Sequence, residues 1–236
     1  MTRVFDRNIF IMLAAVMVGV IIITYFVADI VNKSKIENLT TEHIFEIQDV
    51  NSRNENFTDN FLQGSIMMDS AREVREVANL NFDFALFWFN NALVNASVWF
   101  NNKWVNTTEK LIERCIENCS NAMIKYLTSH NKFGESKPYF VDAKSFTESR
   151  RYIEVLGYYV NFSQLGQTIS ILRYNASKFI KQAAENLSLG ALENVTLAME
   201  NFSMMEGLYQ TALGGYIEMK ERIDDYTFFD EIREEH

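Results

Sequence analysis

Apolar residues near the C-terminal end of this chain follow a strict heptad spacing, which restricts the fold more than any other feature. From Val195 to Ile223 the steps between them alternate between three and four residues. The members of this stripe are Val195, Ala198, Phe202, Met205, Tyr209, Ala212, Tyr216, Met219 and Ile223. Such spacing puts every member on one face of an α-helix, whereas a strand repeats every two residues. The segment is therefore predicted to be a core-facing helix, with Phe202 and Met205 buried and Glu200 exposed.

A second segment, residues 78–99, repeats the spacing. Its stripe consists of Ala78, Phe82, Ala85, Phe89, Ala92, Ala96 and Trp99. The chain of 236 residues contains one proline and nine glycines, whereas β-sandwiches and barrels need turn residues about every 8–12 positions. The sequence therefore predicts an all-α fold of long helices, a helical bundle.

Residues 81–93, "NFDFALFWFNNAL", resemble the second helix of a tetratricopeptide repeat. Ala85, Phe89 and Ala92 occupy the small, aromatic and small positions of that helix. The pattern departs at Glu73 and Glu76, where the first helix of the repeat carries small and aromatic residues, and no 34-residue period recurs. The resemblance implies weak hairpin character and assigns no family.

The breaks in the pattern predict two helical lobes. The only proline lies in residues 131–145, which are predicted to be a linker between a lobe of residues 32–130 and a lobe of residues 146–225. Residues 226–236 are predicted to form an acidic tail. The helices are expected at about 57–79, 81–103, 106–130, 146–162, 164–188 and 190–225, with a break at Leu80–Asn81.

The N-terminal region contains an uncharged apolar run, residues 9–27. Nineteen helical residues span about 28 Å, close to the hydrocarbon thickness of a bilayer. A cleaved signal peptide, the rival interpretation, has a shorter apolar region followed by small residues, and Phe26 and Ala28 do not make such a site. We therefore expect a transmembrane helix at residues 9–31, preceded by a short N-terminal segment, residues 1–8.

Acceptor triplets for N-linked glycans, Asn-x-Ser/Thr, are unusually frequent. With 23 asparagines and 28 serines and threonines, chance gives about three, and the chain has eleven. Accidental triplets on an asparagine-rich surface are the alternative interpretation. Asn32 lies almost against the expected membrane segment and is left out of the predicted sites. Glycosylation is predicted at Asn38, Asn56, Asn95, Asn106, Asn118, Asn161, Asn175, Asn186, Asn194 and Asn201.

The triplets also predict topology, because N-glycans are added to exported parts of a chain. The C-terminal domain is expected to be extracellular and the N-terminus cytoplasmic. An exported domain with only two cysteines is unusual for a small secreted eukaryotic protein, which favours an archaeal cell envelope.

The two cysteines, Cys115 and Cys119, lie four residues apart. On a helix their Cα atoms would be about 6 Å apart, within the range that a disulfide tolerates. Outside the cell a bridge between them is expected. Two free buried thiols, or bonds to another chain, are the alternatives.

No catalytic, cofactor or metal site is predicted. His43, His130 and His236 are far apart in sequence, and the motifs of zinc, di-iron and phosphate sites are missing. Glu109, Glu113 and Glu117 share a helical face, but the interleaved Lys110 and Arg114 favour a solvated, ion-paired surface over a metal site. The aromatic run from residue 82 onward could line a ligand groove, although such residues at helical spacing are more often core.

These features predict a membrane-anchored, N-glycosylated protein without enzymatic activity, a structural or accessory subunit of a membrane or cell-surface assembly. Its expected partners are other membrane or envelope proteins or further copies of itself, with N-linked glycans and the lipid bilayer, and not nucleic acid, given a net charge of −9. The bare contact surface is expected on residues 106–130 or on the tail with Tyr226, Phe228 and Phe229. The alternative is a sensor bundle that binds a small ligand and signals through a membrane partner.

Overall fold

The computed structural model describes the backbone of residues 2–99 and 106–226 and the side chains of residues 44–96 and 108–226. Within these ranges the chain forms four helices: α1 (Thr2–Trp99), α2 (Asn106–Ser145), α3 (Arg150–Ser188) and α4 (Leu192–Asp224). The described backbone contains helices and short turns and no strand, which confirms the all-α prediction. The chain divides into two compact units, residues 1–53 and 54–236, and each is described by itself.

The first unit is helical from residue 2 onward and carries the predicted membrane segment. No helix within the described residues is long and apolar enough to cross a bilayer. The side chains of residues 9–27 lie outside the described set. The transmembrane helix therefore stays a prediction.

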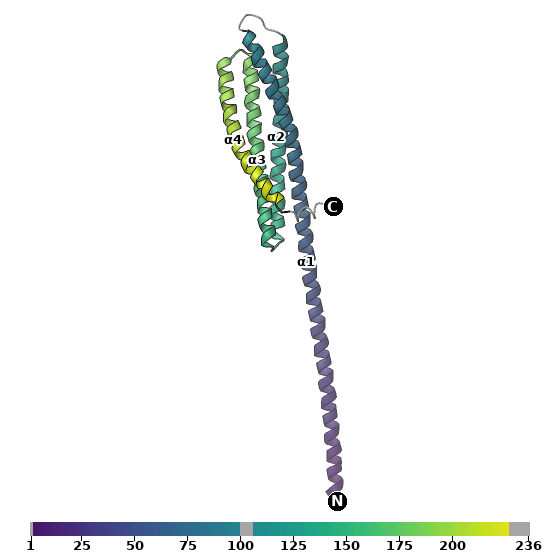
Figure 1. The fold of residues 1–236 in the computed structure, drawn as a ribbon. Helices are drawn as coiled ribbons and strands as arrows, with labels where there is room; N and C mark the ends of the chain where they lie inside the picture. The colour runs from purple at the N-terminus through teal and green to yellow at the C-terminus, as the bar shows by residue number, and fades with distance from the viewer. Residues whose placement is uncertain (1, 100–105, 227–236) are drawn as a thin grey trace. The chain divides into compact units, whose positions relative to one another are not determined.

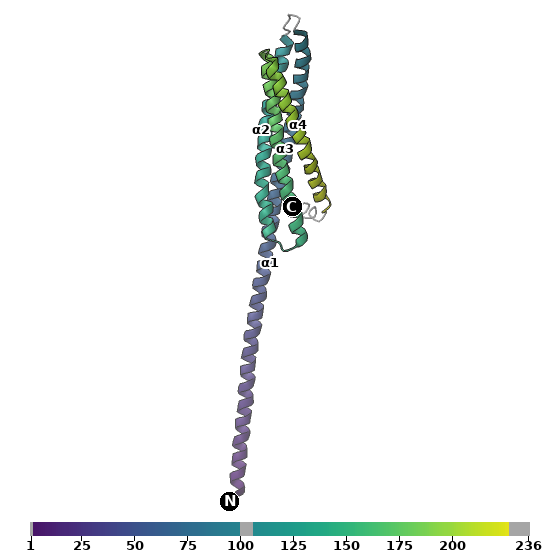
Figure 2. The same ribbon diagram turned by 90° about the vertical axis from the view of Figure 1, so that its left-hand side faces the viewer.

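The second unit is a bundle of four helical stretches: residues 54–99 of α1, then α2, α3 and α4. They lie side by side, and consecutive helices run in opposite directions (Figures 1 and 2). The turn between α3 and α4 is tight, and Gly190 adopts a φ of 70°, which residues with a Cβ rarely take. Ring contacts link α1 to each of the other three helices, through Phe61 with Phe140 and Tyr159 and through Phe82 with Phe202.

The expected break at Leu80–Asn81 is wrong, because α1 continues through it. Its buried stripe keeps the heptad register over this stretch, with Ala78, Phe82 and Ala85 almost fully covered. The break expected between residues 162 and 164 is likewise absent, since α3 is continuous there and Phe162 is buried. Burial by the neighbouring helices thus outweighs the local signals that suggested interruptions. Ala85, Phe89 and Ala92 belong to the same buried stripe. The spacing that resembles a tetratricopeptide repeat is therefore that of a helix packed in a bundle.

The predicted linker at residues 131–145 is also wrong, because this segment is the C-terminal part of α2 and contains Pro138 within the helix. Proline inside a helix removes a hydrogen bond and costs about 3 kcal/mol. Phe133, Phe140 and Ala143 are fully buried along the same stretch, and burying two phenylalanines stabilises by about 3–6 kcal/mol. The two expected lobes are consequently parts of one bundle.

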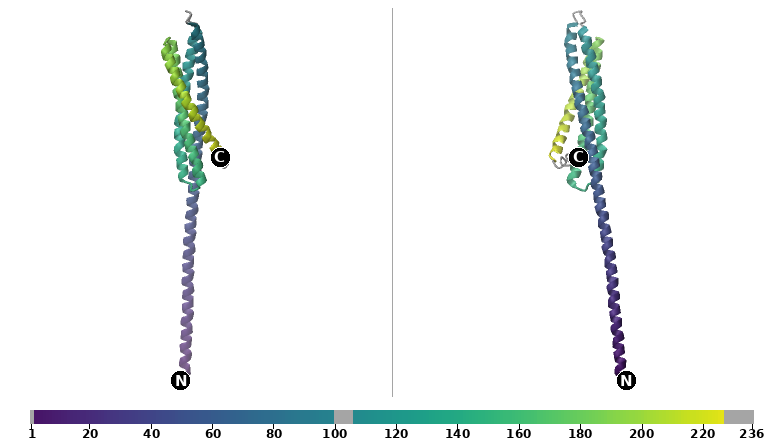
Figure 3. Two further views of the ribbon diagram at one scale, coloured as in Figure 1. Left: turned by 60° about the vertical axis from the view of Figure 1, so that its left-hand side comes forward. Right: turned by 90° about the vertical axis from the view of Figure 1, so that its right-hand side faces the viewer.

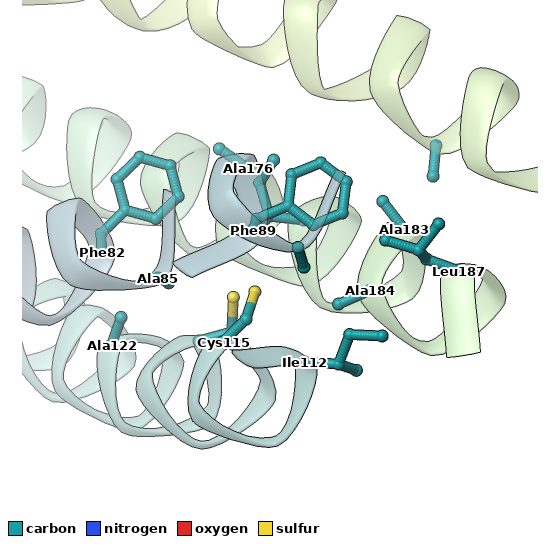
Figure 4. Packing of buried hydrophobic residues seen from close by; sticks show 14 of the residues in the cluster. Phe82, Ala85, Phe89, Ile112, Cys115, Ala122, Ala176, Ala183, Ala184 and Leu187 are labelled. Atoms are coloured by element: carbon teal, nitrogen blue, oxygen red, sulfur yellow. The ribbon is translucent and has the colours of Figure 1, made fainter. Parts of the chain in front are cut away.

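The core consists of two clusters separated along the bundle axis. One lies toward the α3–α4 turn and includes Phe82, Phe89 and Ile180 (Figure 4 shows part of it). The other lies toward the α2–α3 connection and includes Phe61, Phe140 and Tyr159. In the second cluster glycine permits close ring packing, since a Cβ at Gly64 would lie 2.8 Å from Phe140 Cε1.

Helix α4 buries its stripe unevenly. Val195, Ala198, Tyr209 and Tyr216 are buried, whereas Phe202 and Met205 are only half-buried and pack against the edge of the first cluster. The prediction of burial holds for these two in part, and Glu200 is exposed as expected. The C-terminal half of α4 leans away from α3 (Figure 3). This half still contacts α3, since the Tyr216 ring stacks on that of Phe162 with their centres 4.1 Å apart.

Candidate glycan sites and interaction surface

The predicted glycan acceptors lie at the surface wherever the structure describes them. Asn56, Asn161 and Asn194 are exposed. The other five described acceptors are half-buried, namely Asn95, Asn118, Asn175, Asn186 and Asn201. The side chains of Asn38 and Asn106 lie outside the described residues. None of the eight described asparagines is in the core, so each could carry a sugar without opening the bundle, and their occupancy stays a prediction.

Three of the hydroxyl residues that complete these triplets are buried, which the sequence did not indicate. Ser163 and Ser177 are fully covered and Thr108 is 4 % exposed. The Ser163 hydroxyl lies 2.8 Å from that of Ser136 on α2, and Ser177 donates to the carbonyl oxygen of Arg173. These serines therefore have a packing role of their own. A glycosyltransferase that must contact the buried hydroxyl group of such a triplet would have to act before the helix packs into the bundle.

The two cysteines are free, buried thiols in the structure. Cys115 projects from α2 into the cluster beside Ala85 and Ile112 (Figure 4). The pKa of Cys119 is raised far above its usual value, first by its hydrogen bond with Cys115 and then by burial. A protonated, covered thiol is a poor nucleophile. This state matches the second of the three alternatives drawn from the sequence, and the bridge stays a prediction.

Among the described side chains, the acidic and histidine residues considered from the sequence do not form a cluster. Glu109, Glu113 and Glu117 are all exposed on α2. Within the described side chains, no three histidine, cysteine, aspartate or glutamate residues lie close enough to hold a metal ion. His130 has Nδ1 3.1 Å from the carbonyl oxygen of Gln167, and His43 and His236 lie outside the described side chains.

Two arginines occupy the layer between the core clusters, which sequence reasoning missed. The Arg75 guanidinium carbon lies 4.4 Å from the centre of the Tyr216 ring. The Arg173 guanidinium carbon lies 3.7 Å from the centre of the Tyr209 ring, and its Nη1 is 2.6 Å from Glu206 Oε2. Such stacking and pairing lower the cost of placing a cation between apolar clusters. The signal was available, because extending the α1 stripe three residues back from Ala78 reaches Arg75.

The polar atoms of this layer differ in how well they are satisfied. Ser129 donates to the carbonyl oxygen of Ala71 at 2.8 Å, and Tyr126 donates to Asn79 Oδ1 at 2.7 Å. By contrast, Arg75 Nη1, Arg173 Nε and the Tyr216 hydroxyl are buried without a hydrogen-bond partner among the described residues. Burial raises the pKa of Tyr216, and the nearby Arg75 opposes that rise. The raised pKa keeps the Tyr216 hydroxyl protonated at neutral pH.

The aromatic run on α1 divides between the core and the surface. Phe82 and Phe89 are buried, as the core interpretation predicts, and they fill the space that a ligand groove would need. Phe84 and Phe87 are 48 % and 54 % exposed. They belong to a second stripe on α1, termed here the outer seam, which consists of Val77, Leu80, Phe84, Phe87, Asn91 and Val94. Its steps of three and four residues are visible in the sequence, but the spacing alone does not say which stripe is covered.

Neither of two depressions on the described surface has the form of a small-molecule site. Two open depressions lie at the end of the bundle near the α3–α4 turn, one of them lined by Glu109, Ile112, Glu113, Ile116 and Ser188. Binding sites for small molecules are enclosed and mostly apolar, and these depressions are neither. The outer seam, a continuous row of exposed apolar side chains, is a candidate interaction surface.

Comparison with known proteins adds no constraint to this assignment. No family model, no curated protein and no solved structure matches the chain.

Proposed function

We propose that this protein is a single-pass membrane glycoprotein whose helical bundle acts by binding, as a structural or accessory subunit of a cell-surface assembly. The anchor is residues 9–31, the N-terminus is cytoplasmic and the bundle is extracellular. The observation that carries the proposal is the number of acceptor triplets, eleven where chance gives about three. The eight described acceptors lie outside the core, which is compatible with glycosylation, although the described asparagines outside triplets lie there as well.

The distribution of the triplets also supports binding over catalysis. No triplet begins between residues 57 and 94, and this stretch of α1 carries the outer seam. Sugars therefore leave a bare apolar face, which marks interaction sites on many proteins. The density of triplets with only two cysteines favours an archaeal envelope as the setting.

Glycopeptide mapping of the protein purified from native membranes tests the proposal. We expect sugars on most acceptors from Asn56 to Asn201 and recovery of the chain only after detergent extraction. The matched control is Asn60 or Asn121, neither of which begins a triplet, and both should be unmodified. Unmodified peptides throughout, in a chain recovered without detergent, would refute both the topology and the location.

A further inference from the structure

The outer seam has the heptad spacing of a coiled coil, and three of its six members fit a two-stranded one. With Val77, Phe84 and Asn91 at heptad position a, the d positions are Leu80, Phe87 and Val94. A β-branched residue at a with leucine at d, as at Val77 and Leu80, favours two strands. A single asparagine at an a position specifies register and a dimeric state at a cost in stability. Asn91 is the only polar member of the seam, so the pattern points to a helix of the same kind as partner.

The seam is also large enough to hold a partner. Its five apolar side chains are between 46 % and 67 % exposed. Two half-exposed phenylalanines leave about 200 Å² of apolar surface, and the three aliphatic residues raise the total to about 500 Å². Two such faces together would bury roughly 1,000 Å², the lower limit for a specific protein interface.

The charges beside the seam select the partner and its direction. One flank, the g positions, carries Glu76 and Asp83, both exposed. The other flank, the e positions, carries the uncharged Asn81 and Trp88. In a parallel pair of identical helices each acid faces an uncharged residue, Glu76 against the partner's Asn81. In an antiparallel pair the acids of the two copies face each other and repel.

We propose that the outer seam of α1 pairs with the outer seam of a second copy of this chain, in parallel and in register, with the two Asn91 side chains facing each other. This inference rests on the proposed function, because two copies anchored in one membrane must present equivalent faces in the same direction. A parallel pair places residue 54 of both copies at the same end.

The glycan acceptors near the seam are compatible with this pairing. Asn56 lies three heptads before Val77, outside the apolar stretch. Asn95 follows Val94 at a flanking position, so the pairing requires a sugar there to project away from the partner helix. The comparable stripe on α4, which includes the exposed Leu197, Met204 and Leu208, contains the acceptor Asn201 in its middle. A sugar at Asn201 would cover that face, whereas no member of the outer seam begins an acceptor triplet.

Cysteine cross-linking of the full-length protein in native membranes tests the pairing. Leu80→Cys and Phe87→Cys place thiols at two d positions one heptad apart, where identical residues meet only in a parallel pair. Met204→Cys, 55 % exposed on α4, is the control. We expect both seam variants to form a covalent species of twice the chain mass under mild oxidation, and the control and the unmodified protein to stay monomeric.

Four results would overturn the proposal. These are no cross-link at either seam position, a cross-link at only one of them, equal cross-linking at residue 204, or a product whose mass identifies a different chain. A second variant tests the apolar contact itself, since Phe84→Glu should convert an extracted dimer to monomer while Met204→Glu should not. An unchanged far-ultraviolet circular dichroism spectrum in Phe84→Glu shows that the bundle is intact, and a dimer that persists in this folded variant also overturns the proposal.

The same samples separate this inference from the proposed function. Sugars on a membrane-bound chain without cross-links would refute the pairing alone. A chain with neither sugars nor membrane association would refute the proposed function, whereas the cross-links would still decide whether the seams meet.

Discussion

Replacing Phe82 by alanine tests the assignment of the inner and outer faces of α1, with Phe84→Ala as the matched control two residues away. Phe82 is 1 % exposed and Phe84 is 48 % exposed. The Phe82 ring centre lies 6.4 Å from that of Tyr126 on α2 and 6.3 Å from that of Phe202 on α4. The Arg173 guanidinium carbon lies 4.9 Å from its centre. The single substitution therefore removes contacts with three other helices.

The expected loss follows from these contacts. Truncation of a buried phenylalanine costs about 3–5 kcal/mol, the sum of lost transfer energy and the cavity that remains. The lost cation–π contact places the value in the upper half of this range, since such contacts contribute about 0.5–2 kcal/mol. Arg173 keeps its pairing with Glu206 and its stacking on Tyr209, so no charge is left unpaired and the loss should not exceed the range.

Phe84→Ala should lower the free energy of unfolding by less than about 1 kcal/mol. Only half of the side chain is covered, and alanine has the better helix propensity. Tryptophan fluorescence during urea unfolding is a suitable assay, because all three tryptophans lie in the bundle unit. For a unit of this size the melting temperature of Phe82→Ala should fall by about 6–20 °C. Equal effects at the two positions, measured at a protein concentration low enough to keep the chain monomeric, would refute the assignment of faces.

Three further predictions concern the central layer, the cysteines and the proline. Arg75→Leu should leave the free energy of unfolding unchanged or raise it by about 1–2 kcal/mol, because it removes a buried nitrogen without a hydrogen-bond partner. Arg173→Leu should instead lower the free energy of unfolding, because the half-buried Glu206 loses its ion-pair partner. Urea unfolding ranks the two, and the reverse order would contradict the account of the layer. A thiol-reactive label should modify Cys115 and Cys119 only after denaturation, and each chain should then carry two labels. If the denatured chain takes up label only after a reductant is added, the two cysteines form a disulfide bridge. Pro138→Ala should raise the melting temperature if α2 is continuous, and a fall would mean that residues 131–145 form a turn.

The sequence by itself determined the class of the fold and the members of each stripe. Heptad spacing is local, since positions seven residues apart on a helix share a face whatever surrounds them. It correctly indicated that Ala78, Phe82, Phe89 and Val195 face inward. The scarcity of proline and glycine correctly indicated that the described backbone has no strand. The acceptor triplets were visible in the same way, and the structure adds that the described asparagines reach the surface.

Only the tertiary structure decided where helices end and which stripe is covered. Pro138 and Leu80–Asn81 predict interruptions locally, but burial of Phe133, Phe140 and Ala143 against helices far away in sequence outweighs the lost hydrogen bond. The stripes of Phe82 and Phe84 have the same spacing and similar composition, so nothing within α1 distinguishes them. The three other helices cover one and leave the other in solvent, because hydrophobic burial is gained at contacts between elements and cannot be assigned from one element alone.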